Sequence, residues 1–165
     1  MCGRYTQTAA FDELALRFGI TVEDAGLEDL PPRYNVAPSQ SVPIVVAHNG
    51  GRPLVMAKWG FHPVWMKTSK LAPINAKAET VANAPETCTI ITTTPNDLVA
   101  AIHNRMPVIL KRDDEVRWTD AHVTDPAAVL PCLRPLPAEL MEGYPVSTLV
   151  SSPGNEGPRL VQPVS

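Results

Sequence analysis

PIVVAHNGGRPLVMAKW, residues 43–59, has the pattern of two β-strands joined by a tight turn. Pro43 to Ala47 and Leu54 to Trp59 are short apolar runs bounded by proline and glycine, which is typical of strands. His48-Asn49-Gly50-Gly51 between them supplies residues that hairpin turns prefer. The sequence therefore predicts a hairpin in the first half of the chain.

A helix is expected on the N-terminal side of this hairpin, from Thr8 to Gly19. Thr8 is a good N-cap residue, and Gly19 suits the position just after a helix. Apolar side chains recur with helical spacing at Phe11, Leu14, Ala15 and Phe18. This amphipathic helix is expected to face the core.

The C-terminal side of the hairpin predicts alternating short elements. Cys88 to Thr93 is a β-branched strand, and Thr94-Pro95-Asn96-Asp97 starts a helix that runs to Arg105, with Pro95 at its first position. Further short elements are expected in this order: a strand from Met106 to Leu110, helical pieces at Glu115 to Trp118, Pro126 to Leu133 and Pro137 to Gly143, and a last strand after Tyr144 to Thr148. The stretch from Arg33 to Gln40 shows neither the helical nor the strand spacing of apolar residues. Asn35 and Pro38 mark it as an ordered polar loop of the kind that often carries function.

Length and composition indicate a single domain, residues 1–165. The 18 prolines predict a loop-rich chain, and the net charge of −3 excludes a generally basic nucleic-acid coat, so nucleic-acid contacts require a local cationic patch. Three cysteines without CxxC spacing argue against a disulfide framework or a zinc site, so a reduced cytoplasmic protein without metal or cofactor is expected. No run is long and apolar enough to predict a membrane span.

The N-terminal residues Met1-Cys2-Gly3-Arg4-Tyr5 carry the most unusual chemical option. Once Met1 is removed, Cys2 holds a free α-amine that titrates near ~7.7–8.0 and a thiol that titrates near ~8.5. This 1,2-aminothiol can form an imine with an aldehyde and then close a thiazolidine ring. Gly3 lets a substrate approach the backbone, and Arg4 adds a permanent positive charge. The alternative is that Cys2 simply follows the start codon.

Other candidate residues are ambiguous on their own. Trp59 and Trp65 frame a Gly/Pro turn, and either core packing or a base-stacking wall would account for them. In an extended strand Asn75, Lys77 and Glu79 would share one face, which is most often just solvated.

Taken together, the motifs resemble the SOS response-associated peptidase family, the abasic-site processing proteins. The motifs that carry the resemblance recur in the family's order: Met1-Cys2-Gly3-Arg4-Tyr5, Arg33-Tyr34-Asn35-Val36-Ala37-Pro38, Trp59-Gly60-Phe61 with Trp65, Ile74-Asn75-Ala76-Lys77-Ala78-Glu79-Thr80, Ile102-His103-Asn104-Arg105-Met106-Pro107-Val108 and Tyr144-Pro145-Val146-Ser147. The resemblance implies a β-rich α+β domain, with twisted antiparallel sheets forming a barrel-like core and short flanking helices. It also implies a monomer whose cleft holds single-stranded DNA.

The resemblance implies a role for each matching residue. Cys2 would be the nucleophile that traps the abasic-site aldehyde after the loss of Met1, which the protein would remove by itself or with a host aminopeptidase. Asn75 would position Cys2 and its imine, and His103 would act as acid or base during opening of the sugar. The expected DNA-binding residues are Gly3, Arg4, Asn35, Pro38, Trp59, Trp65, Lys77 and Arg105.

Two departures from the family pattern stand out. Lys77 occupies a position where the family usually has arginine, and lysine cannot make a bidentate phosphate contact. The chain is also much too short between residues 80 and 88, where the family carries several strands and a catalytic glutamate. In the family this glutamate lies in an aromatic motif of the form Gly-Phe-Tyr-Glu-Trp. Glu79 and Glu86 are the nearest carboxylates here, and neither stands in such a motif. An internal deletion and impaired catalysis are therefore expected.

Two alternatives remain open at this point. Class II glutamine amidotransferases also begin Met-Cys-Gly and use the N-terminal cysteine as a nucleophile, although their chains are larger. The other alternative is a decayed single-stranded DNA-binding protein that has lost its chemistry.

Overall fold

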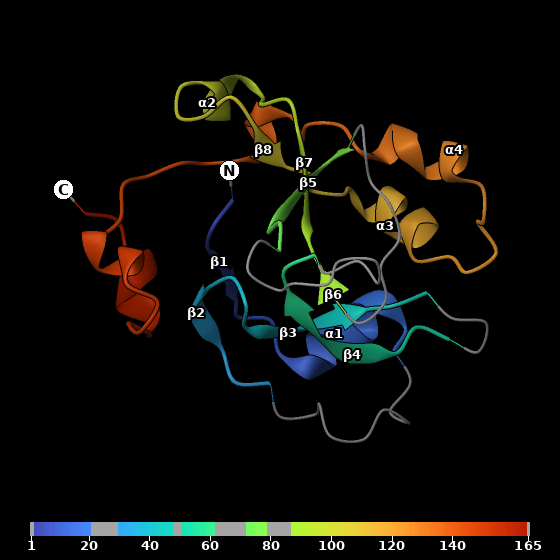
Figure 1. Cartoon of the computed structure of the whole chain (residues 1–165), viewed down its shortest axis with the longest axis horizontal. Helices are drawn as coiled ribbons and strands as arrows, with labels where there is room; N and C mark the ends of the chain where they lie inside the picture. Colours follow the sequence, from blue (N-terminus) through green and yellow to red (C-terminus); the bar gives the residue numbers. More distant parts are fainter. Residues whose placement is uncertain (1, 21–29, 48–50, 62–71, 79–86, 165) are drawn as a thin grey trace.

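The computed structural model describes residues 2–20, 30–47, 51–61, 72–78 and 87–164 (Figure 1). Its central hairpin agrees with the sequence prediction. Strand β3 (Ser41–Val45) pairs antiparallel with β4 (Leu54–Trp59) in a register that runs from Ser41 opposite Lys58 to Val45 opposite Leu54. The turn residues 48–50 lie outside the described part.

Of the other described strands, one joins the hairpin and the rest form two small sheets. Strand β1 (Tyr5–Gln7) pairs antiparallel with β2 (Arg33–Val36), while β6 (Thr87–Cys88) extends the hairpin by pairing parallel with β4. In the third sheet β5 (Asn75–Lys77) lies parallel to β7 (Ile90–Thr93), which lies antiparallel to β8 (Met106–Pro107).

The α+β class is confirmed, but the expectation of a barrel-like core of antiparallel sheets is wrong. In the described part of the chain the three sheets have ends that do not join, and two of the five strand pairings are parallel. Closing a barrel requires every strand to pair on both sides. Strands of two to six residues give too short a ladder for that, and β8 ends at Pro107, which has no N–H to continue one.

The first helix is confirmed at its C-terminal end only. Helix α1 (Phe11–Phe18) ends at Gly19, whose left-handed φ of 63° is the conformation that glycine adopts most readily. Its N-cap is Ala10, without a side-chain hydrogen bond, so the expected cap at Thr8 is wrong. Phe11 packs with Ile20 and Leu54 in a buried core cluster.

One predicted strand, Cys88 to Thr93, is divided between two sheets. It breaks at Thr89, so that β6 joins β4 and β7 joins β5. The next helix is shorter than expected: α2 (Asp97–Ala100) starts at the N-cap Asn96, whose side chain accepts from the Val99 N–H. Pro95 therefore precedes the cap, and His103 lies beyond the helix end.

The described residues of the C-terminal third form mainly short helical elements. They are α3 (Arg112–Trp118), α4 (Pro126–Val129), η3 (Leu130–Cys132), η4 (Ala138–Leu140), η5 (Thr148–Ser151) and η6 (Pro158–Val161). The last strand expected after Tyr144 is absent from the described residues, where a single bridge between Val146 and Pro163 occurs instead. Figure 1 shows this final segment beside β1 and β2, at the left of the view.

Strand β2 is held by this C-terminal segment, contrary to the expectation that Arg33 to Gln40 is all loop. The buried Asn35 side chain donates to the carbonyls of Ser152 and Asn155, at 2.8 and 3.0 Å. The Glu156 carboxylate accepts from the backbone N–H groups of Tyr34, Asn35 and Gly157 at 2.9 to 3.0 Å. These long-range bonds supply partners that no local sequence pattern could indicate.

Replacing Glu156 by alanine should lower the free energy of unfolding by about 1 kcal/mol, because backbone donors lose a charged acceptor at an exposed site. Burial opposes ionisation of Glu156, but the hydrogen bonds from Tyr34, Gly157 and Asn35 outweigh it and lower the pKa of this carboxyl. The Glu156 carboxylate therefore makes its full contribution to the free energy of unfolding above the unfolded-state pKa of about 4.3. This contribution declines as the pH falls below that value.

Urea unfolding of wild type and Glu156→Ala from neutral to acidic pH measures this difference. Glu139→Ala, on the exposed surface of η4, is the matched control and should change stability little. A difference between wild type and Glu156→Ala that stays constant down to the lowest pH would contradict the interpretation.

Candidate functional site

The candidate site begins at Cys2, which lies half-buried just before β1. Its Sγ donates to the carbonyl of Arg4 at 3.4 Å. Burial raises the pKa of the Cys2 thiol, and a backbone hydrogen bond at Arg4 and the terminal ammonium offset this only in part. The direction is upward from the ordinary thiol pKa because the fold shields the sulfur from water.

Asn75 contacts Cys2 directly. Its Nδ2 donates to the Cys2 carbonyl at 3.1 Å, across 73 residues of sequence. Asn75 is the first residue of β5, and the parallel pairing of Asn75 with Ile90 fixes its place. Its buried Oδ1 has no hydrogen-bond partner among the described residues and can accept one from a ligand or an amine.

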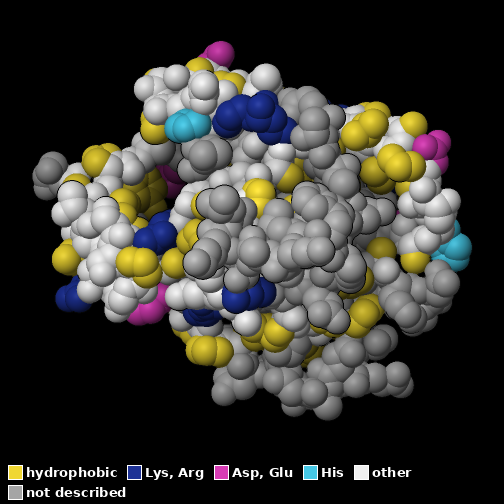
Figure 2. Space-filling view, in the orientation of Figure 1, with side chains coloured by type: hydrophobic (Ala, Val, Ile, Leu, Met, Phe, Trp, Pro, Cys, Tyr) yellow, Lys and Arg dark blue, Asp and Glu magenta, His cyan; other side chains and the backbone are white. Residues whose placement is uncertain are grey.

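The cations Lys77 and Arg105 lie at the other end of β5. Lys77 is on the same face of the strand as Asn75, is exposed, and is in register with Thr92 of β7. Arg105 donates to the carbonyl and the hydroxyl of this Thr92. The sheet thereby places two cations close together, and Figure 2 shows basic side chains gathered beside a histidine near α2.

His103 is oriented by the backbone of the same loop. Its Nδ1 accepts from the N–H of Arg105 at 3.0 Å, so the neutral imidazole carries its proton on Nε2. The side chain is exposed. A chain of contacts therefore leads from Cys2 to Asn75, along β5 to Lys77, through Thr92 to Arg105, and on to His103.

Arg4 and Gly3 have different local roles. Arg4 donates one terminal nitrogen to the Gly3 carbonyl at 2.8 Å and the other to the Ser151 carbonyl at 3.2 Å. Arg4 thus attaches the N-terminus to the C-terminal segment, and these bonds compete with the expected phosphate contact. A Cβ at Gly3 would meet nothing within 4 Å, so there is open space beside the nucleophile.

Trp59 and Asn35 are each only 1% exposed and cannot present a face to DNA in this structure. Trp59 donates its ring N–H to the Ile74 carbonyl at 2.9 Å, and its ring meets Tyr5 edge to face at 5.3 Å. The expectation that these two side chains bind DNA directly is therefore wrong, because both are consumed in packing. Pro38 is half-buried in the turn after β2, and Trp65, like Glu79 and Glu86, lies outside the described residues.

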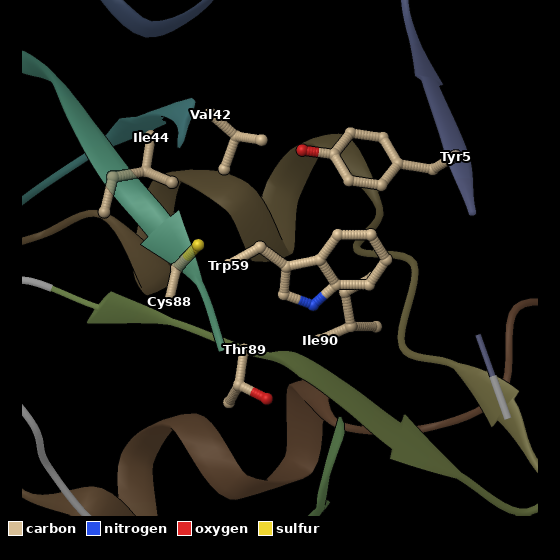
Figure 3. Close-up of a pocket in the computed structure, with 7 residues that line it drawn as sticks. All are labelled: Tyr5, Val42, Ile44, Trp59, Cys88, Thr89 and Ile90. Carbon is tan, nitrogen blue, oxygen red and sulfur yellow. The ribbon is translucent and has the colours of Figure 1, made fainter. Parts of the chain in front are cut away.

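A small apolar cavity of about 240 Å³ lies behind the Tyr5 and Trp59 rings (Figure 3). Its lining residues are Tyr5, Val42, Ile44, Trp59, Cys88, Thr89 and Ile90. Burial, and the neighbouring Cys88, raise the pKa of Tyr5 to about 12, so the ring stays neutral. The cavity wall is thus an apolar support for β1, the strand that follows Cys2.

Sequence reasoning missed three contributors to this site. Thr92 anchors Arg105, Ser151 accepts from Arg4, and Glu156 holds β2. The β-branched pattern of β7 indicated a strand at Thr92, but nothing local pointed to Ser151 or Glu156. Among the described residues, no three His, Cys, Asp or Glu side chains gather as metal ligands would, and no helix has the length and hydropathy to cross a membrane.

Comparison with known proteins adds to this geometry. The model of the SOS response associated peptidase (SRAP) family matches residues 1–86 and 82–153. The chain belongs to the SRAP family. The SRAP relative YoqW of Bacillus subtilis, an abasic site processing protein, is 32% identical over 225 aligned positions, which cover 98% of this chain and 99% of YoqW. YoaM of the same organism, also described as an abasic site processing protein, is 31% identical to this chain. The alignment covers 98% of this chain and 97% of YoaM.

Solved structures show the same fold at low identity. A protein from Bacteroides thetaiotaomicron aligns with a TM-score of 0.79 at 19% identity and covers 99% of this chain and all of its own. A phage-related protein from Bordetella bronchiseptica aligns with a TM-score of 0.56 at 18% identity, over 81% of this chain and 88% of its own.

The SRAP comparisons also locate the shortened region. The alignment with YoqW has 225 positions against 165 residues here, so at least the difference, 60 positions, falls opposite gaps in this chain. The two family matches meet at residues 82–86, inside the region between residues 80 and 88 where a deletion is expected. The alignment length shows that this chain lacks positions that YoqW has, and the junction of the two family matches agrees with the place expected for the deletion.

Proposed function

We propose that this SRAP protein captures the ring-opened aldehyde of abasic sites in single-stranded DNA on Cys2. The observation that carries the proposal is the contact between Asn75 and the Cys2 carbonyl, which puts the N-terminal cysteine at one end of a polar row with two cations at the other. The naming of YoqW and YoaM as abasic site processing proteins supports this substrate.

The proposed chemistry needs no oxidant or additional reactant. After hydrolytic removal of Met1, the α-amine of Cys2 adds to the aldehyde carbon and water leaves, which gives an imine. The Sγ then adds to the imine carbon, and the thiol proton ends on nitrogen, which closes the five-membered thiazolidine ring. Covalent capture of this kind uses an activated nucleophile with general acid–base assistance.

Each contact in the row has a role in this proposal. The Oδ1 of Asn75, which has no partner in the described part, accepts from the α-amine or from the protonated imine. His103 exchanges a proton with the sugar oxygen through its imidazole. Lys77 and Arg105 hold phosphates beside the abasic sugar, and Pro38 and Trp65 line the DNA path.

A denaturing gel tests the proposal. The protein is incubated with a single-stranded oligonucleotide that contains one abasic site, and with the same oligonucleotide after borohydride reduces the aldehyde to an alcohol. We expect a slowly migrating adduct only with the aldehyde, and intact mass should show that the reactive protein lacks Met1. Native binding to both oligonucleotides without an adduct would support the decayed-binder alternative, and glutamine hydrolysis would support the amidotransferase alternative.

The pH dependence of capture should separate its two steps. Because burial raises the pKa of the Cys2 thiol, the reactive thiolate is scarce at pH 7 and grows about tenfold per pH unit below that pKa. The denaturation-resistant product should therefore still increase above the ~8.5 at which an ordinary thiol levels off, whereas the borohydride-trapped imine should level off near the amine pKa of ~8.

Free cysteine reacting with the same oligonucleotide is the control, since its thiol is not shielded. Its product should level off at lower pH than the protein adduct. Identical profiles for free cysteine and protein would contradict an effect of burial on Cys2.

A further inference from the structure

A second cavity, of about 350 Å³, lies next to the nucleophile, between β1 and β2 on one side and the C-terminal segment on the other. Figure 2 shows a hollow with apolar walls between that segment and the rest of the molecule, on the same face as the basic cluster near α2. Its polar and aromatic lining residues are Arg4, Tyr5, Thr6, Tyr34, Glu142 and Tyr144, and Val150 and Leu160 are among its apolar lining residues. This volume lies in the range of pockets that hold small organic groups.

The cavity starts one short step from the site of capture. Arg4 and Tyr5 are two and three residues from Cys2, and the Cys2 Sγ lies 3.4 Å from the carbonyl oxygen of Arg4, so a wall residue stands directly beside the nucleophile. Stacked nucleotides are spaced by about 3.4 Å. A nucleotide next to a captured abasic site can therefore reach the cavity.

The lining favours a base over a phosphate. Glu142 would repel a phosphate, and both terminal nitrogens of Arg4 already donate to carbonyls. Tyrosine rings and guanidinium planes are the surfaces on which unstacked bases settle. The buried Nε of Arg4 has no acceptor among the described residues, and a base carbonyl or ring nitrogen could supply one.

We infer that this cavity is a subsite for one nucleobase next to the abasic site, either its 5′ or its 3′ neighbour. The inference rests on the proposed function, because it takes DNA as the ligand. It assigns the C-terminal segment, through Tyr144, a part in substrate binding. A base held there would fix the strand while the sugar opens at Cys2.

The test uses the full chain and single-stranded oligonucleotides with a tetrahydrofuran abasic analogue, which has no aldehyde and reports binding alone. The 5′ or the 3′ neighbour of the analogue is either 2-aminopurine or a second tetrahydrofuran. We expect the base on one side only to tighten binding about 5- to 150-fold, the range that stacking of one base gives. The 2-aminopurine fluorescence should change on that side only.

The variants test the wall itself. Tyr144 is 47% exposed, so Tyr144→Ala should fold and should remove most of this advantage, while Tyr144→Phe keeps the ring and the advantage. Leu140→Ala, 61% exposed in the preceding η4 and outside the cavity lining, is the matched control and should behave as wild type.

Three outcomes would overturn the subsite: equal affinity with and without neighbouring bases, an advantage that survives Tyr144→Ala, or an equal loss of affinity for all oligonucleotides in that variant. Aldehyde capture is scored separately on the denaturing gel. A neighbour effect without capture would remove the proposed chemistry and leave the subsite, whereas capture without a neighbour effect would remove the subsite alone.

Discussion

Cys2→Ser should lower the yield of the denaturation-resistant DNA adduct by at least about 10³-fold. Removal of a catalytic nucleophile commonly costs more than this. Serine keeps the α-amine and can still form an imine, but its hydroxyl is a weak nucleophile for closing the ring. The measurement is adduct yield on a denaturing gel, with and without borohydride. Only the reduced sample of the variant should show a covalent product.

Cys88→Ser is the matched control for this result. Cys88 is also half-buried, and burial raises the pKa of its thiol as it does for Cys2, but its nitrogen lies in a peptide bond. The Cys88 variant should therefore form the adduct at the wild-type level. An adduct of equal yield and stability from Cys2→Ser would refute the thiazolidine assignment.

Release of DNA from a preformed adduct should be about 10²–10⁴-fold slower than from YoqW, the range that loss of a general acid–base costs. Ring opening and imine hydrolysis require protonation of the leaving sulfur or nitrogen and activation of water. The resemblance to the family implies a glutamate in this role, and no counterpart of its motif occurs between residues 80 and 88. The protein would then act as a trap more than as an enzyme of repeated turnover.

A chase with excess competitor aldehyde measures this release, with YoqW as the reference. His103→Ala should slow capture. Measuring capture and release separately for this variant distinguishes a role of the histidine in capture from the missing group in release. Release as fast as from YoqW would show that another carboxylate has taken over the role. Glu79→Gln and Glu86→Gln, with Glu139→Gln as the control, would then identify it.

Much of the local structure was predictable from the sequence. The β3–β4 hairpin and the end of α1 at Gly19 follow from apolar runs, turn residues and a glycine in a left-handed conformation. The division of the strand at Thr89 was not predictable, since Cys88 to Thr93 is uniformly β-branched apart from Cys88. Which sheet each half joins depends on the partners β4 and β5.

For the candidate site, the sequence by itself determined the reactive group and the family, because a cysteine after Met1 and the ordered motifs are properties of the chain alone. The tertiary structure decided which of the remaining residues can take part. It brought Asn75 to Cys2 and buried Trp59 and Asn35. Glu156 reaches Asn35 across 121 residues. Contacts over such separations depend on how whole elements pack, and periodicity, capping and turn rules describe only neighbours in sequence.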